Sequence, residues 1–271
     1  MNAPIRIGIA GFGNVGVDVA RRLNAGAIPN LIVSAVTARD LVGARERAAT
    51  ITPEPRVVPL VELPAYCDIV VESATADALP EIARIVLAAG KQLTIVSAAG
   101  LLQFPDAAEF AQAHRAKVRV CSGALPGLDI LRCAREGSIH SVKLTSRIKP
   151  GSMAHEPWIL ERGFVLDPPP LAPVKVFDGS AAGAGAAFPR HFNVAIALSL
   201  AGIGLERTQV EVWVDPHVPG AIHRVDVDAE DIQLSMESRN RPSANPRTSR
   251  IVAPSIIATL RGMVAAFVVG S

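Results

Sequence analysis

Three glycines near the N-terminus, Gly11, Gly13 and Gly16, have the spacing of a turn that binds the pyrophosphate of a dinucleotide. The apolar residues 5–10 before them predict a buried strand, and residues 15–23 after them have helical periodicity. In such a turn the first glycine permits the bend, the second leaves room for the pyrophosphate, and the third lets the helix pack closely. The phosphates would bind the free N–H groups of that helix. An ordinary glycine-rich turn between strand and helix is the alternative.

From this turn we predict NAD or NADP as the cofactor. The predicted cofactor contacts in the turn are Gly11, Phe12, Gly13, Asn14, Val15 and Gly16. The second predicted strand, residues 31–36, is followed by Thr37, Ala38, Arg39 and Asp40. An acid at this point usually accepts a hydrogen bond from the ribose 2′-OH of NAD, and Asp40 is placed a little late for it. Arg39 could instead face the 2′-phosphate of NADP, stack on the adenine, or lie in solvent. We therefore expect the protein to use both cofactors.

The elements that position these residues change character halfway along the chain. Strands and helices alternate up to about residue 121, which predicts a doubly wound parallel sheet of the Rossmann type in an α/β domain over residues 1–121. After it, strands of alternating polarity at 139–147, 209–214, 223–229 and 232–239 predict an α+β domain, residues 122–249, with a mostly antiparallel sheet. A final amphipathic helix within residues 250–268 is expected to pack back on the first domain.

Two segments of the second domain, the proline-dense residues 167–170 and residues 179–187, have the composition of linkers or lids. Residues 179–187 consist mainly of glycine and alanine, although the alanines would also permit a helix. We expect residues 179–187 and 151–156 to be movable covers that shield the reacting groups from water.

The composition excludes several classes of function. There are 27 basic and 25 acidic residues and no basic run, so we predict no nucleic-acid partner. The six histidines are scattered, and we predict no metal site. Cys67, Cys121 and Cys133 form no CxxC pair and are expected to be buried thiols of a reducing compartment. The chain enters its first strand at once, so we expect no signal peptide, no membrane segment and a cytoplasmic location.

Four short motifs in the second half, taken in order, resemble the L-aspartate dehydrogenase family. They are residues 122–129, residues 188–195, Ile222 with His223, and residues 240–249. The resemblance implies NAD(P)-dependent oxidation of L-aspartate to iminoaspartate, which water converts to oxaloacetate and ammonia, in a homodimer. In that family the imine can also supply NAD biosynthesis. The resemblance places the catalytic histidine at His223 and further cofactor contacts at Ala124 and Asn193.

The implied reaction needs a base near physiological pH, because hydride leaves Cα only when the amine is neutral. Histidine suits this task, since its unperturbed pKa is about 6.5. Asn193 opens a predicted helix, where its amide could cap that helix or hold the nicotinamide carboxamide. His191 could help to shape the pocket. A dicarboxylate substrate also needs cations. The candidates, among which the sequence does not decide, are Arg147, Lys149, Arg190 and Arg247.

Two other functions remain open from the sequence. One is a related two-domain NAD(P) oxidoreductase of the homoserine dehydrogenase or dihydrodipicolinate reductase type, because fold alone does not fix function. The other is a non-catalytic NAD(P)-binding sensor, whose second domain serves only for association.

Overall fold

The computed structural model describes residues 3–189, 191–241 and 249–270. Their contacts divide the chain into two compact units. Unit 1 comprises the described residues up to Cys121 together with Val252–Phe267. Unit 2 comprises the described residues between Ser122 and Ile251 and those that follow Phe267.

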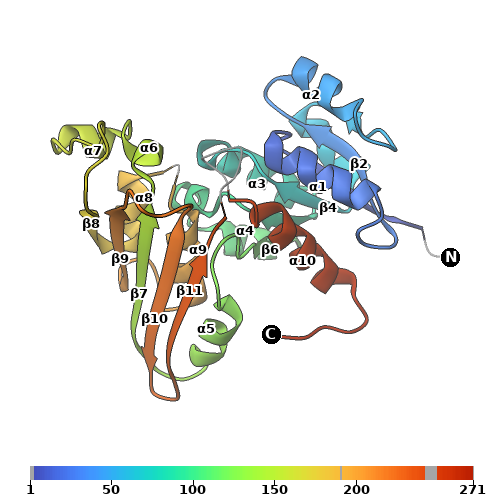
Figure 1. The fold of residues 1–271 in the computed structure, drawn as a ribbon. Coiled ribbons are helices and arrows are strands. Elements are labelled where there is room, and N and C mark those ends of the chain that lie inside the picture. The colour runs from blue at the N-terminus through green and yellow to red at the C-terminus, as the bar shows by residue number, and fades with distance from the viewer. Residues whose placement is uncertain (1–2, 190, 242–248, 271) are drawn as a thin grey trace. The chain divides into compact units, whose positions relative to one another are not determined.

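Unit 1 is built on a six-stranded parallel sheet with the order β3-β2-β1-β4-β5-β6 (Figure 1). The strands are β1 (Ile5–Ala10), β2 (Leu31–Thr37), β3 (Arg56–Val57), β4 (Ile69–Glu72), β5 (Gln92–Ile95) and β6 (Lys117–Val120). The order reverses between β1 and β4, and ligands of open α/β sheets bind at such a reversal, outside the carboxyl ends of the strands. The Rossmann-type fold predicted for the first half is therefore confirmed.

Helices cover both faces of this sheet, which explains why its strands are apolar on both sides. The helices are α1 (Asn14–Asn24), α2 (Leu41–Ala48), α3 (Leu79–Ala88), α4 (Ala107–Ala113) and α10 (Val252–Val264), with short 3-10 turns at Leu60–Tyr66, Ala76–Ala78 and Ala98–Gln103. The core on one face joins α1 and α10, which lie side by side in Figure 1, through residues such as Leu23, Ile256 and Leu260. The core on the other face contains α3 and α4.

Unit 2 contains a five-stranded mixed sheet with the order β11-β10-β7-β9-β8. The strands are β7 (Ile139–Ile148), β8 (Val174–Ser180), β9 (Thr208–Val214), β10 (Ile222–Ala229) and β11 (Gln233–Arg239). Only the β7–β9 pair is parallel. The helices are α5 (Leu128–Ala134), α6 (Pro150–Met153), α7 (Pro157–Glu161), α8 (Ala181–Ala187) and α9 (Asn193–Ala201). The inner face of the sheet carries buried side chains such as Leu144, Val212 and Val225, and the outer face is polar.

Two segments and three cysteines can be compared with their predictions. Residues 179–187 hold the end of β8 and the helix α8, so the helix that their alanines permitted is confirmed and the prediction of a linker is wrong. Residues 151–156 belong largely to the short helix α6 and to the N-cap of α7. Cys67 and Cys121 are buried as expected, and burial raises the pKa of each thiol to about 11. Cys133 lies on the exposed side of α5, so the prediction of three buried thiols fails there.

Candidate functional site

The glycine turn of unit 1 has the geometry that its sequence predicts. Gly11 has a positive φ of 96°, and a Cβ there would collide with the backbone of Ser73 and Ala74. A Cβ on Gly16 would collide with the carbonyl oxygen of Gly11, so only glycine lets α1 lie this close. A Cβ on Gly13 would meet no atom within 4 Å. The turn is therefore packed tightly on the protein side and open at Gly13, which fits a bound pyrophosphate.

The N-terminus of α1 favours an anion. Gly13 is the N-cap, and among the described residues no side chain caps the helix there. The first turn holds no acidic residue, so its N–H groups and the helix dipole present positive charge to a ligand. Asn14, Val15 and Gly16 supply these first N–H groups. Phe12 is only 1% exposed and packs in the core, so its backbone, not its ring, faces the turn.

A buried carboxylate that the sequence reasoning missed supports this edge of the sheet. Glu72, the last residue of β4, is fully buried and pairs with Ala10 of β1. Its carboxylate accepts backbone N–H bonds from Ala74 at 2.7 Å, Val96 at 3.1 Å and Ser97 at 3.0 Å. Burial raises the pKa of Glu72, and these bonds act in the opposite direction. Glu72 thus connects the loops after β4 and β5, and Ser73 beside it donates to the carbonyl of Gly11 at 2.7 Å.

In unit 2, His223 lies on β10 and points to the inner face of the sheet. It is 6% exposed, and its Nδ1 is hydrogen-bonded to Ser146 Oγ on β7 at 3.0 Å. Burial lowers the pKa of His223 to about 4, so the ring is neutral at physiological pH. The expectation of a base that titrates near neutrality is therefore corrected for the free protein. The sequence reasoning did not select Ser146, which fixes the orientation of the ring.

The structure brings Ala124 to the strand beside His223. In the sheet register His223 pairs with Ser238 of β11, and Ser238 Oγ donates to the carbonyl of Ala124 at 2.8 Å. The motif around residues 122–129 therefore reaches the inner face on which His223 lies. Asn193 is the first residue of α9, and Phe192 rather than Asn193 holds the N-cap position. The idea that Asn193 caps this helix is not supported.

The candidate substrate residues have different surroundings. Arg147 points to the outer face, where it forms an ion pair with the buried Asp215 at 3.1 Å and lies over the ring of Trp213. His191 Nε2 is bonded to Glu156 Oε1 at 2.9 Å, and both side chains are largely buried. Lys149 is exposed at the end of β7. The other two candidates, Arg190 and Arg247, lie outside the described residues.

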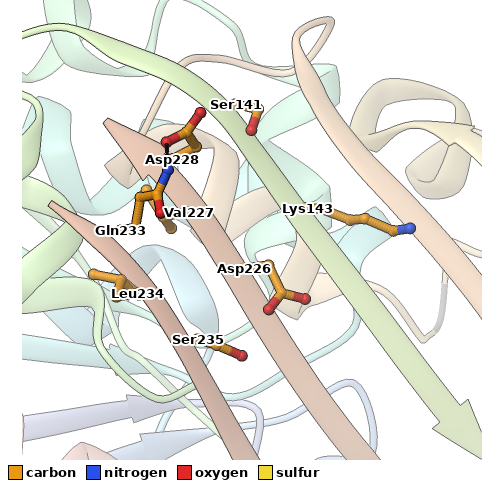
Figure 2. Close-up of a pocket in the computed structure, with 8 residues that line it drawn as sticks. All are labelled: Ser141, Lys143, Asp226, Val227, Asp228, Gln233, Leu234 and Ser235. Atoms are coloured by element: carbon orange, nitrogen blue, oxygen red, sulfur yellow. Dashed lines mark hydrogen bonds between the residues drawn. The ribbon is translucent and has the colours of Figure 1, made fainter. Parts of the chain in front are cut away.

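The outer face of the same sheet has a shallow hollow of about 430 Å³ (Figure 2 shows its lining). The lining side chains Lys143, Asp226 and Asp228 alternate along the strands with inward residues, so the hollow lies on the opposite face from His223. It is therefore separate from the candidate active site. In the described ranges no helix combines the length and apolarity needed to cross a bilayer, and no three His, Cys, Asp or Glu side chains gather as metal ligands.

Comparisons with known proteins match the two halves of the chain to two different family models. Residues 11–121 match the family model described as "Homoserine dehydrogenase, NAD binding domain". Residues 129–263 match the model described as "Aspartate dehydrogenase, C-terminal". Together with the glycine turn, these matches define the class: the chain is an NAD(P)-dependent oxidoreductase.

The full-length relatives identify the family within that class. The chain is 41% identical to L-aspartate dehydrogenase 3 of Bordetella bronchiseptica, over 98% of this chain and 97% of the relative. It is 38% identical to the L-aspartate dehydrogenase of Bradyrhizobium diazoefficiens, over 100% of this chain and 95% of the relative. A solved aspartate dehydrogenase of Thermotoga maritima has the same fold, with a TM-score of 0.76, 22% identity and coverage of 98% and 99%. The chain belongs to the L-aspartate dehydrogenase family, as its motifs suggested.

Proposed function

We propose that this protein oxidises L-aspartate with NAD(P) and that His223 is its acid–base residue. The observation that carries the assignment of His223 is a buried, neutral imidazole whose Nδ1 is fixed by Ser146 at 3.0 Å. When bound, the nicotinamide would supply the acceptor for the hydride of Cα. The amino acid must first lose a proton from its ammonium group, and the product imine then adds water and releases ammonia to give oxaloacetate.

The hydrogen bond to Ser146 leaves Nε2 of His223 for this chemistry. When Nδ1 carries the ring proton it donates to Ser146 Oγ, and the lone pair of Nε2 can then take the proton of the substrate ammonium. After hydride loss the same nitrogen, once deprotonated, can take a proton from the water that attacks the imine. A dicarboxylate near the ring would raise its pKa toward neutrality, because opposite charge favours the imidazolium.

The remaining site assignments are part of this proposal. In unit 1 the residues from Gly11 to Gly16 would hold the pyrophosphate, supported by the open space at Gly13. Ala124 and Asn193 of unit 2 would contact the cofactor, as the family resemblance implies. Lys149 is the favoured substrate cation, since among the described residues no carboxylate forms an ion pair with it. Arg147 and His191 already have acidic partners, Asp215 and Glu156.

We also propose that the protein is a cytoplasmic homodimer with a nucleotide-binding part, residues 1–121, and a substrate and dimerisation part, residues 122–249. The family resemblance supports the dimer, and the buried free thiols of Cys67 and Cys121 support a reducing compartment. Light scattering of the purified protein measures the mass of the particle, and a monomer would contradict the dimer.

The test is substrate-dependent reduction of NAD or NADP, followed by the absorbance of the reduced nicotinamide, with aspartate, glutamate and homoserine as substrates. His223→Ala should lower aspartate turnover at least about a hundredfold, as is typical when a general acid or base is lost. Its affinity for NADH, measured by fluorescence, should stay near that of the wild type. His140→Ala, which changes an exposed histidine of β7, is the control.

The outcomes separate the competing functions. Turnover of homoserine and not of aspartate would indicate the other oxidoreductase type. Tight nucleotide binding without turnover of any amino acid would indicate a sensor. Full aspartate turnover by the His223→Ala protein would remove His223 from the mechanism.

A further inference from the structure

An arginine of α2 reaches back to the glycine turn of unit 1. Arg47 Nε donates to the carbonyl oxygen of Phe12 at 2.9 Å, and Phe12 lies between Gly11 and Gly13. This bond uses one of the five N–H groups of the guanidinium and fixes the direction of its plane. Arg47 is half-buried, so its stem is held by the protein while its head lies at the turn.

The same guanidinium approaches the first turn of α2, which directly follows the loop at the end of β2. A Cβ built on Gly43, in the first turn of α2, would lie 3.0 Å from Arg47 Nη1. The backbone N–H of Gly43 donates to Asp40 Oδ1 at 3.0 Å, so the Asp40 side chain caps α2. The Arg47 guanidinium therefore lies between the glycine turn and the first turn of α2, which directly follows the loop after β2.

The loop after β2 lacks the acid that an NAD-specific site uses. Thr37 ends the strand and is buried, Ala38 follows, and the next residue is the exposed Arg39. The one carboxylate here, Asp40, is engaged as the N-cap of α2. Over the described ranges neither Arg39 nor Arg47 forms an ion pair with it or with another carboxylate.

We propose that Arg39 and Arg47 form a binding site for the 2′-phosphate of NADP, so that the protein prefers NADP to NAD. This inference rests on the cofactor assignment of the proposed function. The loop after the second strand of such a sheet lies at the adenosine ribose, and an arginine there accommodates a 2′-phosphate. A guanidinium that is already oriented offers planar, paired donors to phosphate oxygens at low entropic cost. Arg47 is the oriented member of the pair, and Arg39 adds a second positive charge.

The test uses two nucleotides that differ only in the group at issue, adenosine 2′,5′-bisphosphate and adenosine 5′-monophosphate. Isothermal titration of the full-length protein should give at least about tenfold tighter binding of the bisphosphate, as expected for charge-assisted hydrogen bonds. In Arg47→Ala and in Arg39→Ala the ratio of the two affinities should fall toward one, with the affinity for the monophosphate largely kept. Arg45→Ala, on the exposed side of the same helix, is the matched control and should keep the wild-type ratio.

The ratio of kcat/KM for NADP to that for NAD should fall in the same two variants. If Arg47→Ala disturbs the glycine turn, the binding of both nucleotides should weaken equally and their ratio should not change for that reason. Arg39→Ala does not remove a contact to the turn, so it tests the 2′-phosphate site separately. Equal affinities in the wild type, or variants with an unchanged ratio, would overturn the inference. Preferential binding of the bisphosphate without aspartate turnover would support it while contradicting the proposed function. Failure to bind either nucleotide or NADH would overturn both.

Discussion

The burial of His223 leads to a prediction about how stability depends on pH. The pKa of this ring is lowered from an ordinary value of 6.5 to about 4 in the folded protein, because charging it inside the sheet is unfavourable. The unfolded chain therefore binds a proton at His223 in a pH range where the folded chain does not. In that range stability falls as the pH falls, and the contribution of the neutral ring is complete only above about pH 6.5. The difference in pKa corresponds to roughly 3 kcal/mol.

The perturbation is His223→Gln, which removes the titrating group and keeps a polar side chain beside Ser146. The quantity to measure is the free energy of unfolding of the wild type minus that of the variant, between about pH 7 and pH 4.5. Other titrating groups with a shifted pKa, such as Glu72, are present in both proteins, so their effects cancel in this difference. We expect the difference to shrink by most of roughly 3 kcal/mol as the pH is lowered.

Tryptophan fluorescence in urea is a suitable assay, because both tryptophans, Trp158 and Trp213, belong to unit 2. The signal then reports the unfolding of the unit that contains His223. NMR titration of the imidazole gives the pKa independently. A difference in stability that is the same at both ends of the pH range, or an NMR midpoint near 6.5, would refute the reasoning from burial.

Two further predictions concern residues that support the sites. Ser146→Ala leaves Nδ1 of His223 without its partner. We therefore expect the free energy of unfolding of unit 2 to fall by about 1–3 kcal/mol and aspartate turnover to fall about tenfold, with the affinity for NADH unchanged. Ser141→Ala, on the outer face of β7, is the control, and a fall in NADH affinity as large as the fall in turnover would contradict the positioning role of Ser146. Glu72→Gln places an amide against the backbone N–H groups whose hydrogen bonds the carboxylate accepts. We therefore expect the free energy of unfolding, measured by circular dichroism, to fall by about 3 kcal/mol, with weaker NADH binding. Glu62→Gln, at an exposed position, is the control, and unchanged stability of the Glu72→Gln protein would contradict the assigned role of Glu72.

The fold of unit 1 was predictable because its sequence patterns are local. The apolar runs of β1, β2 and β4 are separated by helices with apolar faces, and a parallel sheet covered on both sides follows from that alternation. The positive φ of Gly11 and the close approach at Gly16 follow from the same short motif.

The glycine and alanine segment of unit 2 was harder to predict, because its structure depends on how its residues pack and not on their composition. Ser180 caps α8 by accepting the N–H of Gly183 at 3.2 Å, and Ala181 and Ala184 are fully buried. A Cβ on Gly183 or on Gly179 would lie within 3.3 Å of the Phe177 ring. The glycines here make room for an aromatic ring, and composition alone cannot distinguish that use from a flexible loop.

The site was predictable only where the chemistry is carried by a motif. Gly11, Gly13 and Gly16 could be selected from spacing, but His223 needed the family resemblance, since one histidine in an alternating strand has no local signature. Glu72 did give a signal, because an acid at the end of the buried run Ile69–Glu72 must find several donors. The pKa of His223 has no counterpart in the sequence, because it depends on how β7 and β11 enclose the ring. A residue type can therefore suggest a base, but the protonation state at which it works is set by the strands that cover it.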